Sequence, residues 1–187
     1  MDLSKNFFQL FALPISFDID MSKLMDAYRS LQKVVHPDHF ASGTDKEKRL
    51  SIEMAAHLNE GVDTLKKPVK RAIYLLKLQG IDVDFEKNTA MSPMFLMDQM
   101  ELREQLEAVA KQADPFIAID ALYERIAVMQ KERIEDFKAA YNRITSDIGS
   151  GDNNGDGNNG NAEDIVAEMQ FVEKLRIDVE RLEETLD

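Results

Sequence analysis

The sequence contains no cysteine. Disulfide bonds are therefore excluded, and so are zinc and iron–sulfur sites held by thiolates. No apolar run approaches the roughly 18 residues that a bilayer-spanning helix needs. The N-terminus also lacks the basic start and the small-residue cleavage site of a signal peptide. We therefore expect a cytoplasmic protein without a membrane partner.

Helix-breaking residues are also scarce. The 187 residues include five prolines and eight glycines, and five of these glycines fall between positions 149 and 161. Hydrophobic residues make up 44% and charged residues 31%, a balance typical of a globular chain. No segment of useful length alternates apolar and polar residues as a half-buried strand would. The sequence therefore predicts an all-α fold.

Apolar residues at helical spacing, together with caps and prolines, predict the order of the helices. The expected helices cover about residues 5–12, 20–36, 45–65, 68–80, 93–112, 115–148 and 162–186. In the third, the expected core stripe is Ile52, Ala55, Leu58, Val62 and Leu65. We expect an N-terminal helical-hairpin domain at 1–80, a linker at 81–92 and a C-terminal three-helix bundle at 93–187. The Gly- and Asn-rich stretch at 149–161 is expected to be a flexible loop.

Charge is divided unevenly between the two halves. Residues 1–80 carry 12 basic against 10 acidic side chains, a net of +2, whereas residues 81–187 carry 11 against 25, a net of −14. Such asymmetry indicates two halves with different partners. The acidic half argues against nucleic-acid binding, which depends on Lys and Arg neutralising phosphates.

The tripeptide His36-Pro37-Asp38 lies between two expected helices. Proline restricts the loop, so the flanking imidazole and carboxylate would project from a fixed turn. Arg29 and Lys33 lie four residues apart on the preceding helix and share a face, which gives a cationic strip leading to an anionic tip. Alone, the tripeptide is a weak signal, because Asp38 also fits a helix cap and His36 an ordinary surface residue.

Three longer segments, NFFQLFALP, LMDAYRSLQKVVHPD and LNEGVDTLKKPVKRAIYLL, make residues 6–76 resemble a J domain. The resemblance implies docking on a DnaK-type (HscA-type) ATPase chaperone and stimulation of its ATP hydrolysis. Carried over by position, it assigns chaperone binding to Arg29, Lys33, His36, Pro37 and Asp38. Two positions depart from the pattern. His39 replaces the common Lys or Arg, and Gly61 replaces a better helix former at a cost of up to about 1 kcal/mol.

The helix expected from Pro93 carries two apolar stripes. At about 100° per residue, one side gathers an ordinary core stripe of Phe95, Leu102, Leu106 and Val109. Roughly the opposite side gathers Leu96, Met97 and Met100, beside Glu101 and Glu104. The second stripe indicates either a helix that packs on two sides or an exposed patch rimmed by acids, which is typical of a protein-binding surface.

The segments FLMDQMELREQL and MQFVEKLRIDVERLEETL resemble the C-terminal domain of the HscB family. The resemblance implies that this domain binds an IscU-type iron–sulfur cluster scaffold protein. The matching positions are Leu96, Met97, Met100, Glu101, Glu104 and Phe171. Ala108 stands where an acidic residue is sometimes found, one turn further along. The similarity extends over nearly the whole chain outside the Gly- and Asn-rich stretch.

That stretch also fits the calcium-loop pattern D-x-[DN]-x-[DN]-G-x5-E. The matching residues are Asp152, Asn154, Asp156, Gly157 and Glu163. The polar Asn159 occupies a place that is usually apolar, and no second such loop exists to pair with this one. A stretch built from Asp, Asn and Gly also matches by composition alone, so metal binding is the weaker interpretation.

An enzyme would have to use His36, Asp38 and His39 as metal ligands or acid–base groups. The third histidine, His57, lies among apolar neighbours, and no second polar cluster has ligand spacing. We therefore expect a co-chaperone, neither an enzyme nor dependent on a cofactor, that delivers the scaffold to the chaperone for cluster transfer. A J-domain protein with another client, or a plain helical scaffold, is the alternative, and burial of the second stripe would favour it.

Overall fold

The computed structural model describes residues 5–36, 40, 43–85, 93–150 and 156–186. Within these ranges the regular structure is entirely helical, and the predicted all-α class is confirmed. None of the described helices is both long and apolar enough to cross a bilayer. The chain divides into two compact units, residues 1–78 and 79–187.

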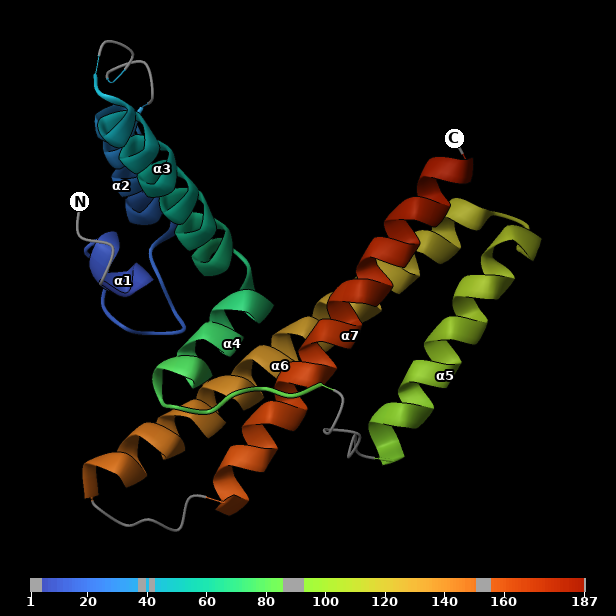
Figure 1. Cartoon of the computed structure of the whole chain (residues 1–187). Helices are drawn as coiled ribbons and strands as arrows, with labels where there is room; N and C mark the ends of the chain where they lie inside the picture. Colours follow the sequence, from blue (N-terminus) through green and yellow to red (C-terminus); the bar gives the residue numbers. More distant parts are fainter. Residues whose placement is uncertain (1–4, 37–39, 41–42, 86–92, 151–155, 187) are drawn as a thin grey trace. The chain divides into compact units, whose positions relative to one another are not determined.

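The first unit is built on a helical hairpin. It contains α1 (Phe7–Leu10), α2 (Met21–Val35), α3 (Asp45–Lys66) and α4 (Pro68–Leu78). α2 and α3 run antiparallel side by side (Figure 1). Local capping sets where each begins: Asp20 accepts a hydrogen bond from the Lys23 N–H at 3.0 Å, and Thr44 forms a capping box with Glu47. The start of each of the two hairpin helices is therefore determined by residues close to it in the sequence.

The core of the first unit joins α1 to the hairpin. Its fully buried side chains include Phe8, Leu24, Leu58, Leu65 and Leu75. The α1 helix comes so close to α3 that a Cβ atom at Gly61 would lie 2.9 Å from Cδ1 of Phe7 and 3.0 Å from Cε2 of Phe11. Gly61, which departs from the expected pattern, is therefore the residue that allows this contact.

The predicted core stripe of α3 is wrong at its first position. Ile52 is 61% exposed, whereas its neighbour Ser51 is buried. The buried Ser51 hydroxyl donates to the carbonyl of Lys48 at 2.9 Å. Because that bond satisfies the hydroxyl within the helix, a small polar residue can occupy the inward position there.

The second unit is built on a long antiparallel pair, α6 (Pro115–Ser150) and α7 (Asp156–Leu186). α5 (Pro93–Ala108) continues into a 3-10 turn (Val109–Lys111) and lies along one end of this pair (Figure 1). The three helices share one core, made of Phe95, Leu102, Val109, Ile119, Leu122, Ile126, Val172, Leu175 and Val179. The predicted core stripe of the helix that begins at Pro93 is thereby confirmed, with Leu106 packed against this core.

The predicted loop at 149–161 is wrong in its extent. α6 reaches Ser150 and α7 begins at Asp156, so helix covers both ends of that stretch. The intervening positions 151–155 lie outside the described residues. Composition rich in Gly and Asn favoured a loop, but helices already nucleated by packing extend into such sequence.

Candidate functional site

The first candidate surface lies at the end of α2. Arg29 and Lys33 are both exposed on this helix, and Arg29 pairs with Asp26 one turn earlier at 2.5 Å. His36 is exposed and forms the extended C-cap of α2. The structure therefore brings three of the predicted chaperone-binding residues to one end of the hairpin. The other two, Pro37 and Asp38, lie outside the described residues.

A small apolar hollow of about 200 Å³ adjoins the last turn of α2. Its lining includes Val34, Phe40, Leu50 and Met54. Val34 is 67% exposed, so it is available to a partner that docks on this end of the hairpin. The sequence did not indicate this hollow, because the hollow depends on how α2 and α3 pack and not on one helical stripe.

Two residues of the J-domain pattern, Arg71 and Tyr74, support the frame. The buried Arg71 guanidinium donates to the carbonyl of Leu65 at the end of α3, at 2.5 Å, and lies 4.7 Å above the ring centre of Phe17. Burial holds the pKa of Arg71 below its ordinary value. The Tyr74 hydroxyl accepts a hydrogen bond from the Phe7 N–H at 2.9 Å, which ties α4 to α1. These residues position the hairpin and do not present a surface.

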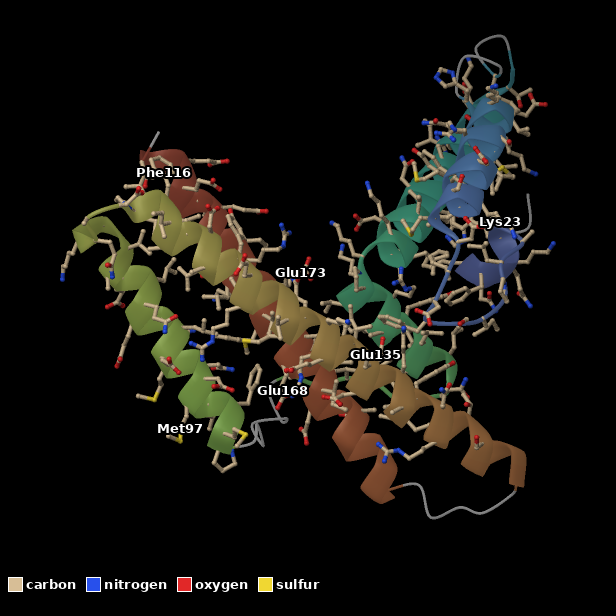
Figure 2. The ribbon with its side chains drawn as sticks, turned by 180° about the vertical axis from the view of Figure 1, so that it is seen from behind. Lys23, Met97, Phe116, Glu135, Glu168 and Glu173 are labelled. Atoms are coloured by element: carbon tan, nitrogen blue, oxygen red, sulfur yellow. The ribbon has the colours of Figure 1, made fainter. Side chains whose placement is uncertain are left out.

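The second candidate surface is the α5 strip, which we define as Leu96, Met97 and Met100. These side chains are 43%, 72% and 65% exposed. On the opposite side of the same helix, Phe95 and Leu102 are buried. Met97 projects from α5 on the side away from α6 (Figure 2). Within the second unit, the second apolar stripe is therefore exposed and does not pack against the core that α5 shares with α6 and α7.

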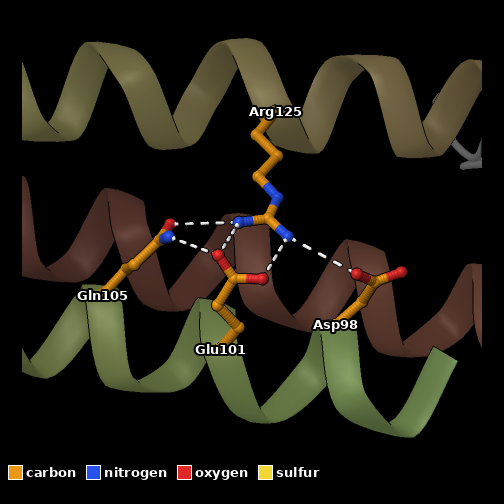
Figure 3. Close-up of polar contacts among 4 residues, drawn as sticks. All are labelled: Asp98, Glu101, Gln105 and Arg125. Atoms are coloured by element: carbon orange, nitrogen blue, oxygen red, sulfur yellow. Dashed lines mark hydrogen bonds and ion pairs between the residues drawn. The ribbon is translucent and has the colours of Figure 1, made fainter. Parts of the chain in front are cut away.

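Glu101, predicted to contact a client, is exposed but already forms an ion pair with another helix of the same unit. Its two oxygens accept hydrogen bonds from Arg125 of α6 at 3.0 and 2.9 Å (Figure 3). Arg125 also pairs with Asp98 at 3.5 Å, and Gln105 donates to Glu101 at 3.0 Å. The hydrogen bonds from Arg125 lower the pKa of Glu101. This cluster ties the polar edge of α5 to α6 directly beside the α5 strip.

The two other predicted client-binding residues differ in their surroundings. Glu104 is exposed, and nothing in the described part of the chain pairs with it. Phe171 of α7 is half-buried, meets the Phe95 ring edge to face at 5.7 Å and lies 5.4 Å below the Arg103 guanidinium. Phe171 also lines a hollow of about 570 Å³ together with Phe85. Phe171 therefore connects the α5 core to an open part of α7.

The enzyme and metal interpretations gain no support from the described residues. Within these ranges, no group of three His, Asp or Glu side chains is arranged to hold a metal ion. His57 packs against the Phe7 ring, with 5.2 Å between ring centres. Asp38 and His39 lie outside the described residues.

The calcium-loop interpretation is contradicted by the helix at its second half. Asp156 and Glu163, the fifth and twelfth positions of the pattern, both belong to α7. A helix separates residues seven apart by about 10 Å along its axis, whereas a calcium loop curls these positions around one ion. Asp152 and Asn154 lie outside the described residues.

An all-helical hairpin with basic residues at the end of α2, followed by a helical bundle with an exposed apolar strip, is the arrangement expected of a J-domain co-chaperone. A family model described as the HSCB C-terminal oligomerisation domain matches residues 91–180. The co-chaperone HscB homologue of Vibrio cholerae is 38% identical over 181 residues, 97% of this chain and 98% of that protein. A homologue from Cupriavidus taiwanensis is 41% identical over 187 residues, with the same coverage of both chains. The chain therefore belongs to the HscB family of co-chaperones, as the resemblance predicted.

Solved structures agree with this assignment. The chaperone HscB of Vibrio cholerae superposes with a TM-score of 0.82 at 37% identity, over 98% of this chain and 100% of the other. Human co-chaperone HscB gives a TM-score of 0.81 at 26% identity, over 98% of this chain and 84% of the other. The similarity therefore includes both units and is not confined to the hairpin.

Proposed function

We propose that this co-chaperone binds an IscU-type iron–sulfur cluster scaffold, delivers it to an HscA-type ATPase of the DnaK class and stimulates ATP hydrolysis by that chaperone. One observation carries the client half of the proposal. The α5 strip is exposed, while the other side of the same helix fills the core. An exposed apolar strip costs solubility, and its retention is best explained by a partner that covers it.

The chemistry of the strip suits a protein client. Methionine adapts its shape to a partner surface, and leucine provides a firm apolar contact. Glu104 adds an unpaired carboxylate at the edge of the strip, where it can meet a basic group of the client. Phe171 extends the apolar area onto α7 and completes the proposed scaffold-binding set together with Glu101.

The cationic end of α2 supports the chaperone half. Arg29, Lys33 and His36 lie at one end of the hairpin, and the family resemblance adds Pro37 and Asp38. Basic side chains in such a row favour an acidic surface on the ATPase and guide its approach. The exposed Val34 beside them offers an apolar contact to the same partner.

Steady-state ATP turnover by the chaperone tests the whole proposal. It should be measured for the chaperone alone, with this protein, and with this protein plus the scaffold. We expect stimulation that increases when the scaffold is present and that disappears with His36→Gln. If ATP turnover does not increase, the proposed action on the chaperone is refuted. If it increases equally with and without the scaffold, the client is another protein.

A binding measurement tests the client surface separately. The triple change Leu96→Ala, Met97→Ala and Met100→Ala should weaken scaffold binding by more than a hundredfold, since a central apolar contact contributes about 1–2 kcal/mol. Val128→Ala is the matched control, because Val128 is an exposed apolar residue of α6 outside the strip. Equal loss in both variants would contradict the assignment of the surface.

A further inference from the structure

The methionines of α5 are more exposed than the other methionines of the described residues. Met94, Met97 and Met100 are 77%, 72% and 65% exposed. Outside α5, the most exposed methionine in the described ranges is Met21 at 37%, whereas Met169 is 5% exposed. The three residues recur at every third position, so successive members are neighbours on the helix surface. The most accessible thioethers of the described residues therefore gather on and beside the α5 strip, where Figure 2 labels Met97.

The absence of cysteine gives this arrangement a chemical consequence. With no thiol in the chain, the methionine thioethers are its only oxidisable sulfur atoms. A dissolved oxidant must reach the sulfur, and burial protects Met169 in the core. We propose that Met94, Met97 and Met100 are sites of reversible oxidation by peroxide-class oxidants, and that their oxidation releases the client from the α5 strip.

The step is an oxygen-atom transfer. The lone pair on Sδ attacks one peroxide oxygen, the O–O bond breaks and an S–O bond forms. The sulfur is oxidised by two electrons to the sulfoxide, and hydrogen peroxide is reduced to water, whose second proton comes from the hydroxyl that was transferred. Methionine sulfoxide reductases return the thioether, so the change can act as a switch.

The product would oppose docking through its polarity. A sulfoxide replaces a flexible apolar group by a strong hydrogen-bond acceptor. When an apolar partner without a hydrogen-bond donor covers the sulfoxide, the sulfoxide loses its water. This desolvation cost corresponds to at least a tenfold loss of affinity for the client. Leucine at the same positions would supply a similar apolar volume without a sulfur atom to oxidise.

This inference rests on the proposed scaffold binding, so the experiment separates the two. The intact protein is treated with hydrogen peroxide, and peptide mass spectrometry determines the order in which methionines gain oxygen. We expect Met94, Met97 and Met100 to be oxidised before Met21 and long before Met169. Oxidation in which Met169 or Met21 precedes them would overturn the assignment of the sites, whatever the client is.

Affinity for the scaffold, measured by calorimetry, tests the consequence. Binding should weaken at least tenfold after oxidation and recover after treatment with the reductases. A variant carrying Met94→Leu, Met97→Leu and Met100→Leu conserves volume, and its affinity after peroxide should equal its own affinity before treatment, whatever that starting value is. Equal loss of affinity in this variant would overturn the switch. If the untreated protein does not bind the scaffold, the proposed function and the switch are both refuted. The order of methionine oxidation from mass spectrometry would still test the proposed oxidation sites.

Discussion

The close approach of α1 to α3 makes Gly61→Ala a sharp test of the packing in the first unit. A methyl group at this position would lie 2.9 Å from Cδ1 of Phe7 and 3.0 Å from Cε2 of Phe11. Carbon atoms in contact normally lie about 3.5–4.0 Å apart, so both rings would have to move by roughly half an ångström or more. Phe11 is buried in the core and Phe7 is held against Tyr74, which leaves little room for such a shift.

Two opposing effects determine the size of the change. Alanine is favoured over glycine in a helix interior by about 1 kcal/mol. Forcing an extra group into a packed core costs about 1–3 kcal/mol. We therefore expect Gly61→Ala to lower the free energy of unfolding of the first unit by about 1 kcal/mol. In an open helix the same substitution would stabilise the protein.

Amide hydrogen exchange of the full chain in urea, followed by mass spectrometry of peptides from α1 and α3, measures this change without averaging over the second unit. Ala56→Gly is the matched control, because Ala56 is an exposed residue of the same helix and reports helix propensity alone. Adding Phe7→Leu to Gly61→Ala should restore part of the loss. If Gly61→Ala instead slowed exchange in α3, the close approach of α1 described here would be refuted.

Three further substitutions test contacts in both units. Tyr123→Phe removes the 2.7 Å hydrogen bond to Glu183 and should cost about 1 kcal/mol in urea unfolding at neutral pH. Burial and Glu183 raise the pKa of Tyr123 to about 12. The hydrogen bond therefore contributes its full stability below pH 10. The difference in unfolding free energy between Tyr123→Phe and the native protein should vanish as the pH rises through 12. Arg71→Lys loses the planar donor to Leu65 and should lower the melting temperature by several degrees, about 2 kcal/mol in stability; an unchanged value would contradict the buried role. Ala12 has a φ of 54°, so Ala12→Gly should raise the free energy of unfolding by about 0.5 kcal/mol, and a loss in calorimetric melting would argue against that backbone.

The helices with local signals at their ends were predictable from sequence. Asp20 marks the start of α2 and Thr44 that of α3, because each cap acts within three residues of itself. The two faces of α5 were also predictable, since the 3.6-residue period alone separates Phe95 from Met97. These predictions needed no knowledge of what each helix packs against.

The features that sequence reasoning missed depend on distant residues. Arg125 lies 24 positions from Glu101, and no local pattern connects them. From the sequence, Gly61 is only a poor helix former within α3. In the structure, the aromatic rings packed against it leave no room for a side chain. Ile52 fitted the helical period but lies where α3 is not covered, so its stripe position did not lead to burial. Periodicity indicates which residues share a face, but tertiary packing decides which face is buried.

The pairing of Glu101 with Arg125 changes how the acidic half of the chain should work with a client. Residues 81–187 carry a net charge of −14, against +2 for residues 1–80, yet the Glu101 carboxylate beside the α5 strip is already paired with Arg125. Charge spread over the unit can attract a basic client from a distance and speed its association. The contact itself would then be made mainly by the uncharged side chains of the α5 strip, with Glu104 at its edge, and those contacts set how long the complex lasts. In this arrangement Arg125 fixes the edge of α5 and spares the docked complex a buried, unpaired carboxylate, whose cost would otherwise oppose binding.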